Sequence, residues 1–537
     1  MSRRSKPRAT PPRRLPRGPA LEFLLVVAAA WAARLLFLAR RPDAAAATSL
    51  LYWGDTPIFV GAAQGLLRGI PFDSGIPLHP PGFFYLLAGW FGLTGEPTAG
   101  GFLLLKGFLA LLGALTIGVF YLLARHAAGR RVALLALPAA IFSFGHYVHS
   151  TAINSEGLYL LLVLATLYAS AVLIARLRAE PAQRRMPLPA AAGLLGALAA
   201  ATALTRSEFL LTSLLIAALL LLAARRRRTL ATACYLLGLL LALTPWILRA
   251  HETLGAVNRA NAARLPGPLP TWVPVTSGGP LNFATANNDF ATGTFDTRLI
   301  DRLVPERPIL GLDLADPAVY RLYTAGYAIG SDWMRAHPQA ALALIGRKLA
   351  FAADAFALGY LQNNVPAGLT GERRPVDQFI PSAGALRWVH LVLALVGAAH
   401  LVRRWRRERA GGTRARTPGH TWLGVPLGAW LLLAHAGVTL AVIVAFFGYV
   451  RFGFLLAPLL WLLLGAAFDF LGGLLGRGRR VGGLSAGRIV ALVVVLLLGV
   501  EAVATLYGPQ RLEAAGSRLP GTNRINPDDR VRLRPSE

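Results

Sequence analysis

The stretch AGGFLLLKGFLALLGALTIGVFYLLARHAAGRR, residues 99–131, decides the fold of this chain. Its apolar part, 99–124, is longer than the ~20 residues that a helix needs to cross the hydrocarbon of a bilayer. Arg125, Arg130 and Arg131 follow at once. A backbone in lipid must form its hydrogen bonds within the segment, so the stretch predicts a transmembrane helix with a charged end.

The same pattern recurs along the chain, which has 537 residues, of which 55% are hydrophobic, and a mean hydropathy of +0.51. This composition excludes a disordered chain and an ordinary soluble fold. We therefore expect an all-α polytopic membrane protein of about 11 transmembrane helices, with extracytoplasmic loop regions that contain interfacial helices. The predicted spans cover residues 21–39, 99–124, 132–149, 157–175, 188–204, 209–224, 230–248, 386–402, 421–447, 452–472 and 488–507.

Arginine accounts for nearly all of the net charge of +29. Most arginines stand in short blocks between apolar runs, and the positive-inside rule assigns such blocks to the cytoplasmic side. All blocks fall on one side, with the N-terminus cytoplasmic, if 331–362 is an interfacial or re-entrant helix with Arg347 and Lys348 on its polar face. The predicted domains are a basic disordered tail at 1–18, an N-terminal transmembrane module at 19–250 with a first periplasmic loop at 40–98, a large periplasmic loop with an interfacial helix at 251–385, C-terminal transmembrane helices at 386–507 and a periplasmic tail at 508–537.

Composition and motifs also disfavour several function classes. No aromatic-basic module of the kind that reads RNA or DNA is visible, so nucleic acid is not an expected partner and the arginines are assigned to anionic lipid headgroups. The one cysteine, Cys234, allows neither a disulfide nor a thiolate metal site within the chain. No Walker motif, nucleotide fingerprint or nucleophile elbow follows a predicted strand. The chemistry would therefore use a substrate that already resides in the membrane.

Ionisable residues gather at the predicted outer ends of different helices. Charged groups in or beside spans are costly and are functional hypotheses by default. A helical bundle would bring several of them into one outward-facing cavity, as in a membrane enzyme. The residues are Asp55, Asp73 and His79 in the first loop, His146, His149 and Glu156, then Arg206 and Glu208, and Arg451.

Asp55 lies just outside the first span, in a stretch that also contains Tyr52. Its carboxylate could act as a general base, or as an orienting group, for an acceptor hydroxyl or amine. The alternative is an N-cap for a helix that opens with Thr56-Pro57, since Asp suits the cap and proline suits the first turn. The two roles are compatible, and the sequence leaves both open.

Three further side chains are candidates for binding a donor phosphate, each with a structural alternative. His79 precedes Pro80-Pro81-Gly82 and could instead be a surface turn residue. Arg206 offers the planar fork that suits a phosphate, but it could equally form a structural pair with Glu156 or Glu208. Arg451 has aromatic neighbours and could simply snorkel at the interface.

A divalent metal is left open by one weak signal. His146 and His149 are spaced i, i+3, which can put two imidazoles on one helix face, and Glu156 follows nearby. No cofactor is otherwise indicated by the sequence.

Several motifs, taken in order and spacing, resemble the GT-C superfamily of polytopic glycosyltransferases. The resemblance is to the protein O-mannosyltransferase and lipid A aminoarabinose transferase-like branch, which is common in bacteria, and it covers roughly residues 20–475. The motifs that carry it are Gly54-Asp55 with AAQGLLRG at 62–69, HPPGFFYLL at 79–87, Ser155-Glu156, TRSE at 205–208, TPWILR at 244–249 and NNDFATG at 287–293.

The resemblance implies a sugar donor linked to polyprenyl phosphate and catalysis on the periplasmic side of a bacterial inner membrane. It implies that the first-loop carboxylate, here Asp55, is catalytic and that the transfer inverts the anomeric centre. The mannosyltransferases commonly have an acidic pair where this chain has Asp55-Thr56. Protein O-mannosylation in particular is therefore not implied.

The leading hypothesis from sequence is thus a glycosyltransferase that acts on a glycan, lipid or protein acceptor, with membrane lipids as its other partners. Tyr52, Glu156, Glu208, Asn287 and Asn288 are candidate substrate contacts. A transporter or flippase of lipid-linked saccharides is the alternative. Transporters often show inverted repeats and charged sites near the midplane, whereas this chain shows no repeat and has its ionisable groups at the helix ends.

Overall fold

The computed structural model describes residues 18–41, 44–47, 55–95, 97–178, 188–224, 227–294, 298–303, 313–358, 383–410, 421–448, 450–475, 480–481 and 484–485. These residues are helical except for loops, one 3-10 turn and two hairpins, whose strands have two residues each. The elements are α1 (Gly18–Ala39), α2 (Thr56–Leu67), η1 (Phe72–Gly75), α3 (Gly82–Thr94), α4 (Ala99–Ala128), α5 (Arg130–Ile141), α6 (Phe144–Thr151), α7 (Ser155–Arg178), α8 (Leu188–Thr205), α9 (Phe209–Ala223), α10 (Arg228–Ala260), α11 (Gly279–Ala286), α12 (Arg298–Leu303), α13 (Pro317–Ala336), α14 (Pro338–Leu358), α17 (Ala383–Ala410), β1 (Thr421–Trp422), β2 (Val425–Pro426), α18 (Leu427–Ala445), α19 (Val450–Phe454), α20 (Ala457–Leu475), β3 (Arg480–Val481) and β4 (Leu484–Ser485).

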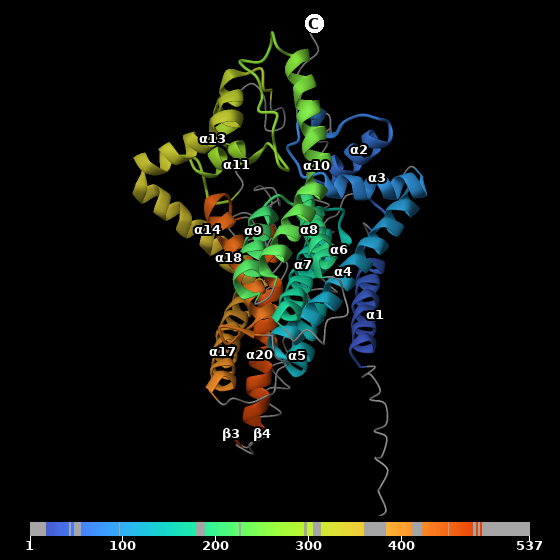
Figure 1. Ribbon diagram of the computed structural model, residues 1–537, viewed down its shortest axis with the longest axis vertical. Coiled ribbons are helices and arrows are strands. Elements are labelled where there is room, and N and C mark those ends of the chain that lie inside the picture. The colour runs from blue at the N-terminus through green and yellow to red at the C-terminus, as the bar shows by residue number, and fades with distance from the viewer. Residues whose placement is uncertain are drawn as a thin grey trace, which may run out of the picture.

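The chain is a helical, multi-pass membrane protein, as predicted (Figure 1). Among the described residues, six helices are long and apolar enough to cross a bilayer: α1, α4, α7, α8, α10 and α18. The pair α5 and α6, bent by 66°, could form a seventh span. The predicted number of about 11 spans is therefore not confirmed. The span expected at 488–507 lies outside the described residues.

Glycines let α8 and α10 pack with their backbones in contact. A β-carbon on Gly196 would overlap the Tyr235 carbonyl, and one on Gly238 would overlap the Gly193 carbonyl. In lipid there is no hydrophobic driving force for helices to associate. Small residues at a helix interface instead stabilise the pair because they let the backbones make close van der Waals contact. The two helices consequently form a closely packed pair.

Described arginines of two blocks, 125–131 and 403–409, lie together at one end of the bundle. Arg125 and Arg130 both contact Glu22 at the start of α1. At the α4–α5 junction, a β-carbon on Gly129 would lie 3.2 Å from a terminal nitrogen of Arg404. These contacts join segments that are far apart in sequence, and they define what we call the arginine-rich end.

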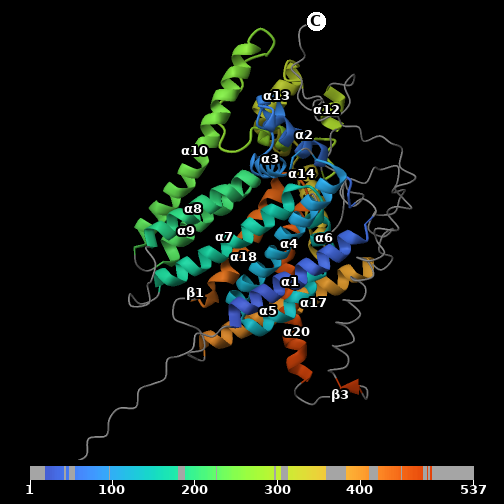
Figure 2. The same ribbon diagram turned by 90° about the vertical axis from the view of Figure 1, so that its right-hand side faces the viewer.

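The opposite end has a hydrophobic core of its own. With 33 residues, α10 is about 50 Å long, which exceeds the ~30 Å of bilayer hydrocarbon. Figures 1 and 2 show its C-terminal part projecting beyond the bundle. The chain then folds back, because Trp246 Nε1 donates to the Val275 carbonyl at 2.8 Å and the Asn258 amide pairs with the Leu269 backbone. Apolar residues of α2, α3, α10 and α13 close this core together.

The segment predicted as a single interfacial helix at 331–362 is two helices. The chain breaks at His337, whose ψ of 60° is not helical, and Pro338 opens α14. Proline disfavours the α conformation in the residue before it and is accepted in a first turn, so the break follows from the sequence. The placement of Lys348 on a polar face is wrong as well, since its side chain is fully buried.

Two introduced cysteines would test the sidedness of the bundle. In a Cys234→Ser background we expect Pro270→Cys to react with a membrane-impermeant maleimide in intact cells, because the loop after α10 is predicted to be extracytoplasmic. Arg406→Cys, at the arginine-rich end, should react only after permeabilisation. Labelling of both positions in intact cells would contradict the predicted topology.

Candidate functional site

Asp55 occupies the N-cap position of α2, but its side chain makes no capping hydrogen bond within the described part of the chain. Asp55 contributes to the helix start only through its backbone, whose carbonyl accepts from Phe59 N at 2.9 Å. The carboxylate is therefore positioned by the helix start without being used to hold it. The structure does not support the capping role, and a catalytic role for Asp55 stays a prediction.

The start of α2 is docked on the link between α6 and α7. Thr56 is buried, and its hydroxyl donates to the Ile153 carbonyl at 2.9 Å. Ile153 lies only three residues before Glu156, in the first turn of α7. This hydrogen bond thus places the first loop beside the start of α7, which carries Glu156.

Arg206 lies between two carboxylates. Its Nη1 donates to Glu156 Oε1 at 2.9 Å and its Nε to Glu208 Oε1 at 2.6 Å. Glu156 is fully buried, whereas the Glu208 side chain is 16% exposed. The rings of Tyr159 and Phe452 cover the guanidinium, with centroids 5.6 and 5.1 Å from its central carbon.

The charges of this cluster, one guanidinium and two carboxylates, sum to −1 when all three groups are ionised. The structural pairing that the sequence offered as an alternative for Arg206 is therefore present, with both predicted partners at once. A role for Arg206 in donor binding stays a prediction. Any anion that approached it would have to displace or complement a carboxylate.

His79 is held by Asp73. The His79 backbone N–H donates to Asp73 Oδ2 at 2.9 Å, and the ring Nδ1 lies 2.9 Å from the same oxygen. Asp73 adopts φ 52°, a left-handed conformation that few non-glycine residues accept. The turn that contains His79 is thus held by a nearly buried carboxylate, and His79 is not an exposed surface residue.

Glycine 82 brings this turn to the end of α8. A β-carbon on Gly82 would lie 2.9 Å from both the Leu204 carbonyl oxygen and Thr205 Oγ1. Arg206 is the next residue along the chain. The starts of α2, α3 and α7 and the link 205–208 therefore meet at one end of the bundle, where Figure 1 shows α2 and α3 lying against the tops of the spans.

His146 and His149 each contact another side chain, and their role as a metal pair stays a prediction. Nδ1 of His146 contacts the guanidinium of Arg34, a buried residue of α1. The ring of His149 lies on Phe454, with centroids 4.5 Å apart. A cation beside one imidazole and an aromatic ring on the other do not suit a dication, and the described residues contain no group of three or more His, Cys, Asp or Glu that could hold one.

Asn287 and Asn288 use their amides inside the protein. Asn287 Nδ2 donates to the Ala445 carbonyl at 2.9 Å, and its Oδ1 accepts from Lys348 Nζ at 2.9 Å. Asn288 Nδ2 donates to the Ala284 carbonyl at 3.0 Å. Both residues are buried, so this motif ties the large loop to α14 and α18. Their contact with a substrate stays a prediction.

For two of the predicted site residues, the structure describes the backbone alone or nothing. Tyr52 is not among the described residues, and only the backbone of Arg451 is described, within α19. Because the next residue, Phe452, covers the Arg206 guanidinium, the α19 backbone does pass beside the Arg206 cluster.

Sequence reasoning missed two buried cations. Arg34 donates to the Ala30 carbonyl at 2.8 Å and to Ser150 Oγ at 3.1 Å, so it anchors α6 to α1. An arginine within an apolar run was the available signal, because such residues are rare and usually serve a purpose. No comparable signal in the sequence indicates that Lys348 is buried, because a lysine in an amphipathic helix is expected to lie on the solvent-exposed face.

No protein-family model and no curated protein matches this sequence. The fold is similar to the oligosaccharyltransferase of Archaeoglobus fulgidus in the apo form, at 14% identity and a TM-score of 0.49, over 95% of this chain and 57% of that one. The same protein in complex with an inhibitory peptide and a dolichol-phosphate matches at 14% identity and a TM-score of 0.48, over 93% and 56%. This chain thus spans little more than half of the length of that enzyme.

ArnT from Cupriavidus metallidurans bound to undecaprenyl phosphate is also similar, at 15% identity and a TM-score of 0.34, over 93% of this chain and 89% of that one. At 14–15% identity these similarities concern the fold alone.

We expect Gly82→Ala to disturb the site. The added methyl group must push the α3 turn away from a backbone carbonyl, which cannot yield as a flexible side chain would, and overpacking of this kind costs about 1–3 kcal/mol. Gly89→Ala, in the same helix with nothing within 4 Å, is the matched control. Thermal unfolding in detergent should show a lower midpoint for Gly82→Ala alone; equal midpoints would contradict the close approach.

Lys348 should give the protein a pH-dependent stability. Burial lowers the pKa of Lys348 from 10.5 to about 8. Between these values the unfolded chain binds more protons than the folded one, so stability rises with pH in that window, and below about pH 8 the cost of the buried charge is constant. The unfolding midpoint of the wild type relative to Lys348→Met should therefore increase from pH 7 to pH 10. A difference that does not change with pH would refute this.

Proposed function

We propose that this protein is a membrane glycosyltransferase that moves a sugar from a polyprenyl-phosphate-linked donor to an extracytoplasmic acceptor, which is a glycan, a lipid or a protein. The observation that carries the proposal is the position of Asp55 at the N-cap of α2, directly before Thr56. This is the residue that the GT-C resemblance makes catalytic. The Thr56–Ile153 bond brings it toward the turn of α7 where the Arg206 cluster begins.

Asp55 acts in this scheme as a general base. Its carboxylate takes the proton of the acceptor hydroxyl or amine while that atom attacks the anomeric carbon of the sugar. The bond between the anomeric carbon and the phosphate oxygen breaks, and polyprenyl phosphate leaves with the electron pair. Direct displacement inverts the anomeric centre. No nucleotide is needed, because a phosphate monoester is already a good leaving group.

The leaving phosphate gains negative charge and must be met by cations. We propose that it reaches Arg206 by taking the place of Glu208, the more exposed of the two carboxylate partners. Glu156, fully buried, would keep the guanidinium in place during this exchange. His79, on its Asp73 support, and Arg451 are the other proposed donors to the phosphate.

A single carboxylate at the start of α2 distinguishes this chain from the mannosyltransferases that it resembles. Thr56 stands at the second acidic position, and its hydroxyl is committed to the Ile153 carbonyl. A carboxylate there would face a carbonyl oxygen, and the two acceptors would repel each other. The proposal therefore does not extend to protein O-mannosylation.

A transporter or flippase of lipid-linked saccharides is the second candidate. One observation favours it: the α5–α6 pair is bent by 66°, as a broken span or a re-entrant loop would be, and Arg34 is buried against it. Broken helices with charged groups in the membrane are typical of transporters. The same donor would serve both activities, but a flippase would move it without breaking the glycosidic bond.

Asp55→Asn should abolish transfer while the protein still folds. The amide keeps the shape of the side chain but cannot accept the proton, and loss of a general base typically costs 10²- to 10⁴-fold in rate. The measurement is transfer of labelled sugar from a polyprenyl-phosphate donor by the protein in proteoliposomes. Asp332→Asn, an exposed carboxylate of α13, is the control.

Two outcomes would contradict the proposal. Full transfer by Asp55→Asn would remove Asp55 as the base. Movement of the labelled donor between leaflets, with no sugar transferred by the wild type to any acceptor class, would support the flippase instead.

A further inference from the structure

A groove at the arginine-rich end, far from the proposed active site, has the composition of a lipid site. It lies between α5 and α20, which pack directly on each other where a β-carbon on Gly465 would approach the Val132 carbonyl to 2.6 Å. Figure 1 shows both helices at the lower end of the bundle. The groove is lined by Arg130, Arg131, Leu134, Leu135, Pro138, Phe468 and Gly472.

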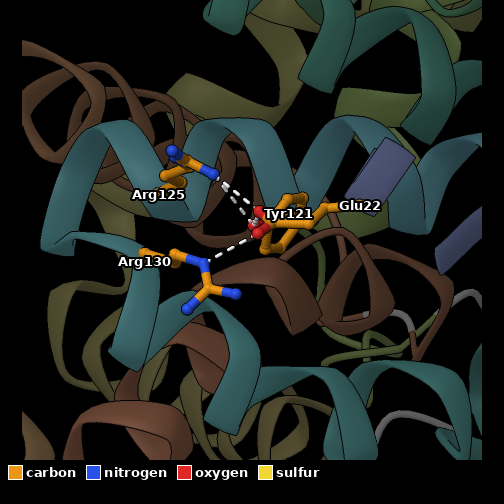
Figure 3. A network of polar contacts seen from close by, with 4 residues as sticks. All are labelled: Glu22, Tyr121, Arg125 and Arg130. Atoms are coloured by element: carbon orange, nitrogen blue, oxygen red, sulfur yellow. Dashed lines mark hydrogen bonds and ion pairs between the residues drawn. The ribbon is translucent and has the colours of Figure 1, made fainter. Parts of the chain in front are cut away.

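Two exposed arginines stand at the mouth of this groove, and each uses its Nε for an internal ion pair. Arg130 Nε lies 2.8 Å from Glu22 Oε1, and Arg131 Nε lies 2.8 Å from Asp469 Oδ1. Figure 3 shows the terminal nitrogens of Arg130 directed away from Glu22. Nη2 of Arg131 would be 3.3 Å from a β-carbon on Gly472, which places this nitrogen at the groove wall. The pairs therefore orient both guanidinium groups without using their terminal donors.

The carboxylates of this region already have more than one partner. Glu22 is contacted by Tyr121 and Arg125 as well as by Arg130 (Figure 3). Asp469 is contacted by His400 at 3.1 Å as well as by Arg131. Three arginines thus face two carboxylates, and the mouth of the groove keeps a net positive charge even with His400 neutral.

The start of α5 adds to this attraction. Gly129 stands at its N-cap and has no side chain to satisfy the first backbone N–H groups of the helix. The helix dipole also favours an anion at this end. Behind the arginines the groove wall is apolar, formed by Leu134, Leu135 and Phe468. An anionic head next to an apolar tail is the chemistry that this arrangement matches.

We propose that the groove binds an anionic phospholipid of the surrounding bilayer. Its phosphate contacts the terminal nitrogens of Arg130 and Arg131, and one acyl chain lies along the apolar wall. Basic pockets between transmembrane helices bind acidic lipid headgroups in this way. Since α5 (Arg130–Ile141) and α20 (Ala457–Leu475) are far apart in the sequence, the lipid would contact two distant segments of the chain at once. The inference does not depend on the proposed glycosyl transfer.

Thermal unfolding of the purified full-length chain in detergent tests the proposal. Added phosphatidylglycerol should raise the unfolding midpoint, whereas phosphatidylcholine and inorganic phosphate should not, because the first lacks net charge and the second lacks the acyl chain. The shift should be lost in the double variant Arg130→Gln/Arg131→Gln. Arg335→Gln, an exposed arginine of α13 that also pairs with a carboxylate, should keep it.

A second variant covers the case in which the double variant does not fold. Leu135→Trp fills the apolar wall and leaves both arginines and their ion pairs in place, and it too should lose the shift. The amount of phosphatidylglycerol that co-purifies, measured by mass spectrometry, should fall in parallel. An equal shift with phosphatidylcholine, an equal shift with inorganic phosphate, or an undiminished shift in either groove variant would overturn the proposal.

Discussion

The ion pair between Arg206 and Glu156 is the constraint on which the proposed active site depends. Glu156 is fully buried at the start of α7, where an unpaired carboxylate would be very costly, and removing one partner of such a pair typically costs about 3–5 kcal/mol. Arg206 can reach it only if the link after α8 lies over the α7 start. Once that is so, Gly82 and Thr56 bring the starts of α3 and α2 to the same place.

The charges of this region limit what it can do. Asp55 and the Arg206 cluster leave a surplus of carboxylates among the described groups, which suits proton abstraction better than the capture of a free phosphate. A donor that brings its own membrane anchor needs less electrostatic capture, because the polyprenyl chain already holds it at the bilayer. The proposed base and the proposed phosphate contacts can then share one end of the bundle.

The two ends of the bundle use arginine differently. At the arginine-rich end the side chains are exposed, they neutralise carboxylates through Nε, and they leave terminal nitrogens toward a lipid groove. At the other end Arg206 is largely enclosed by carboxylates and aromatic rings. Arg34, in between, is fully buried and donates to a carbonyl of its own helix and to a hydroxyl of α6. The same residue type thus serves lipid contact, site assembly and helix packing, and burial separates the three.

The sequence by itself determined the helical membrane class, the positions of the six long apolar helices and the set of ionisable residues near the helix ends. These depend on the length of apolar runs and on turn residues, which are local properties of the chain. Only the tertiary structure decided that Asp55 does not cap α2, that Arg206 contacts both of its predicted partners, that Arg34 contacts His146 and that Lys348 is buried. Three of these four concern side chains held by residues that are about 50 to more than 100 positions away. Such contacts exist only after the helices have packed, and no local pattern encodes them.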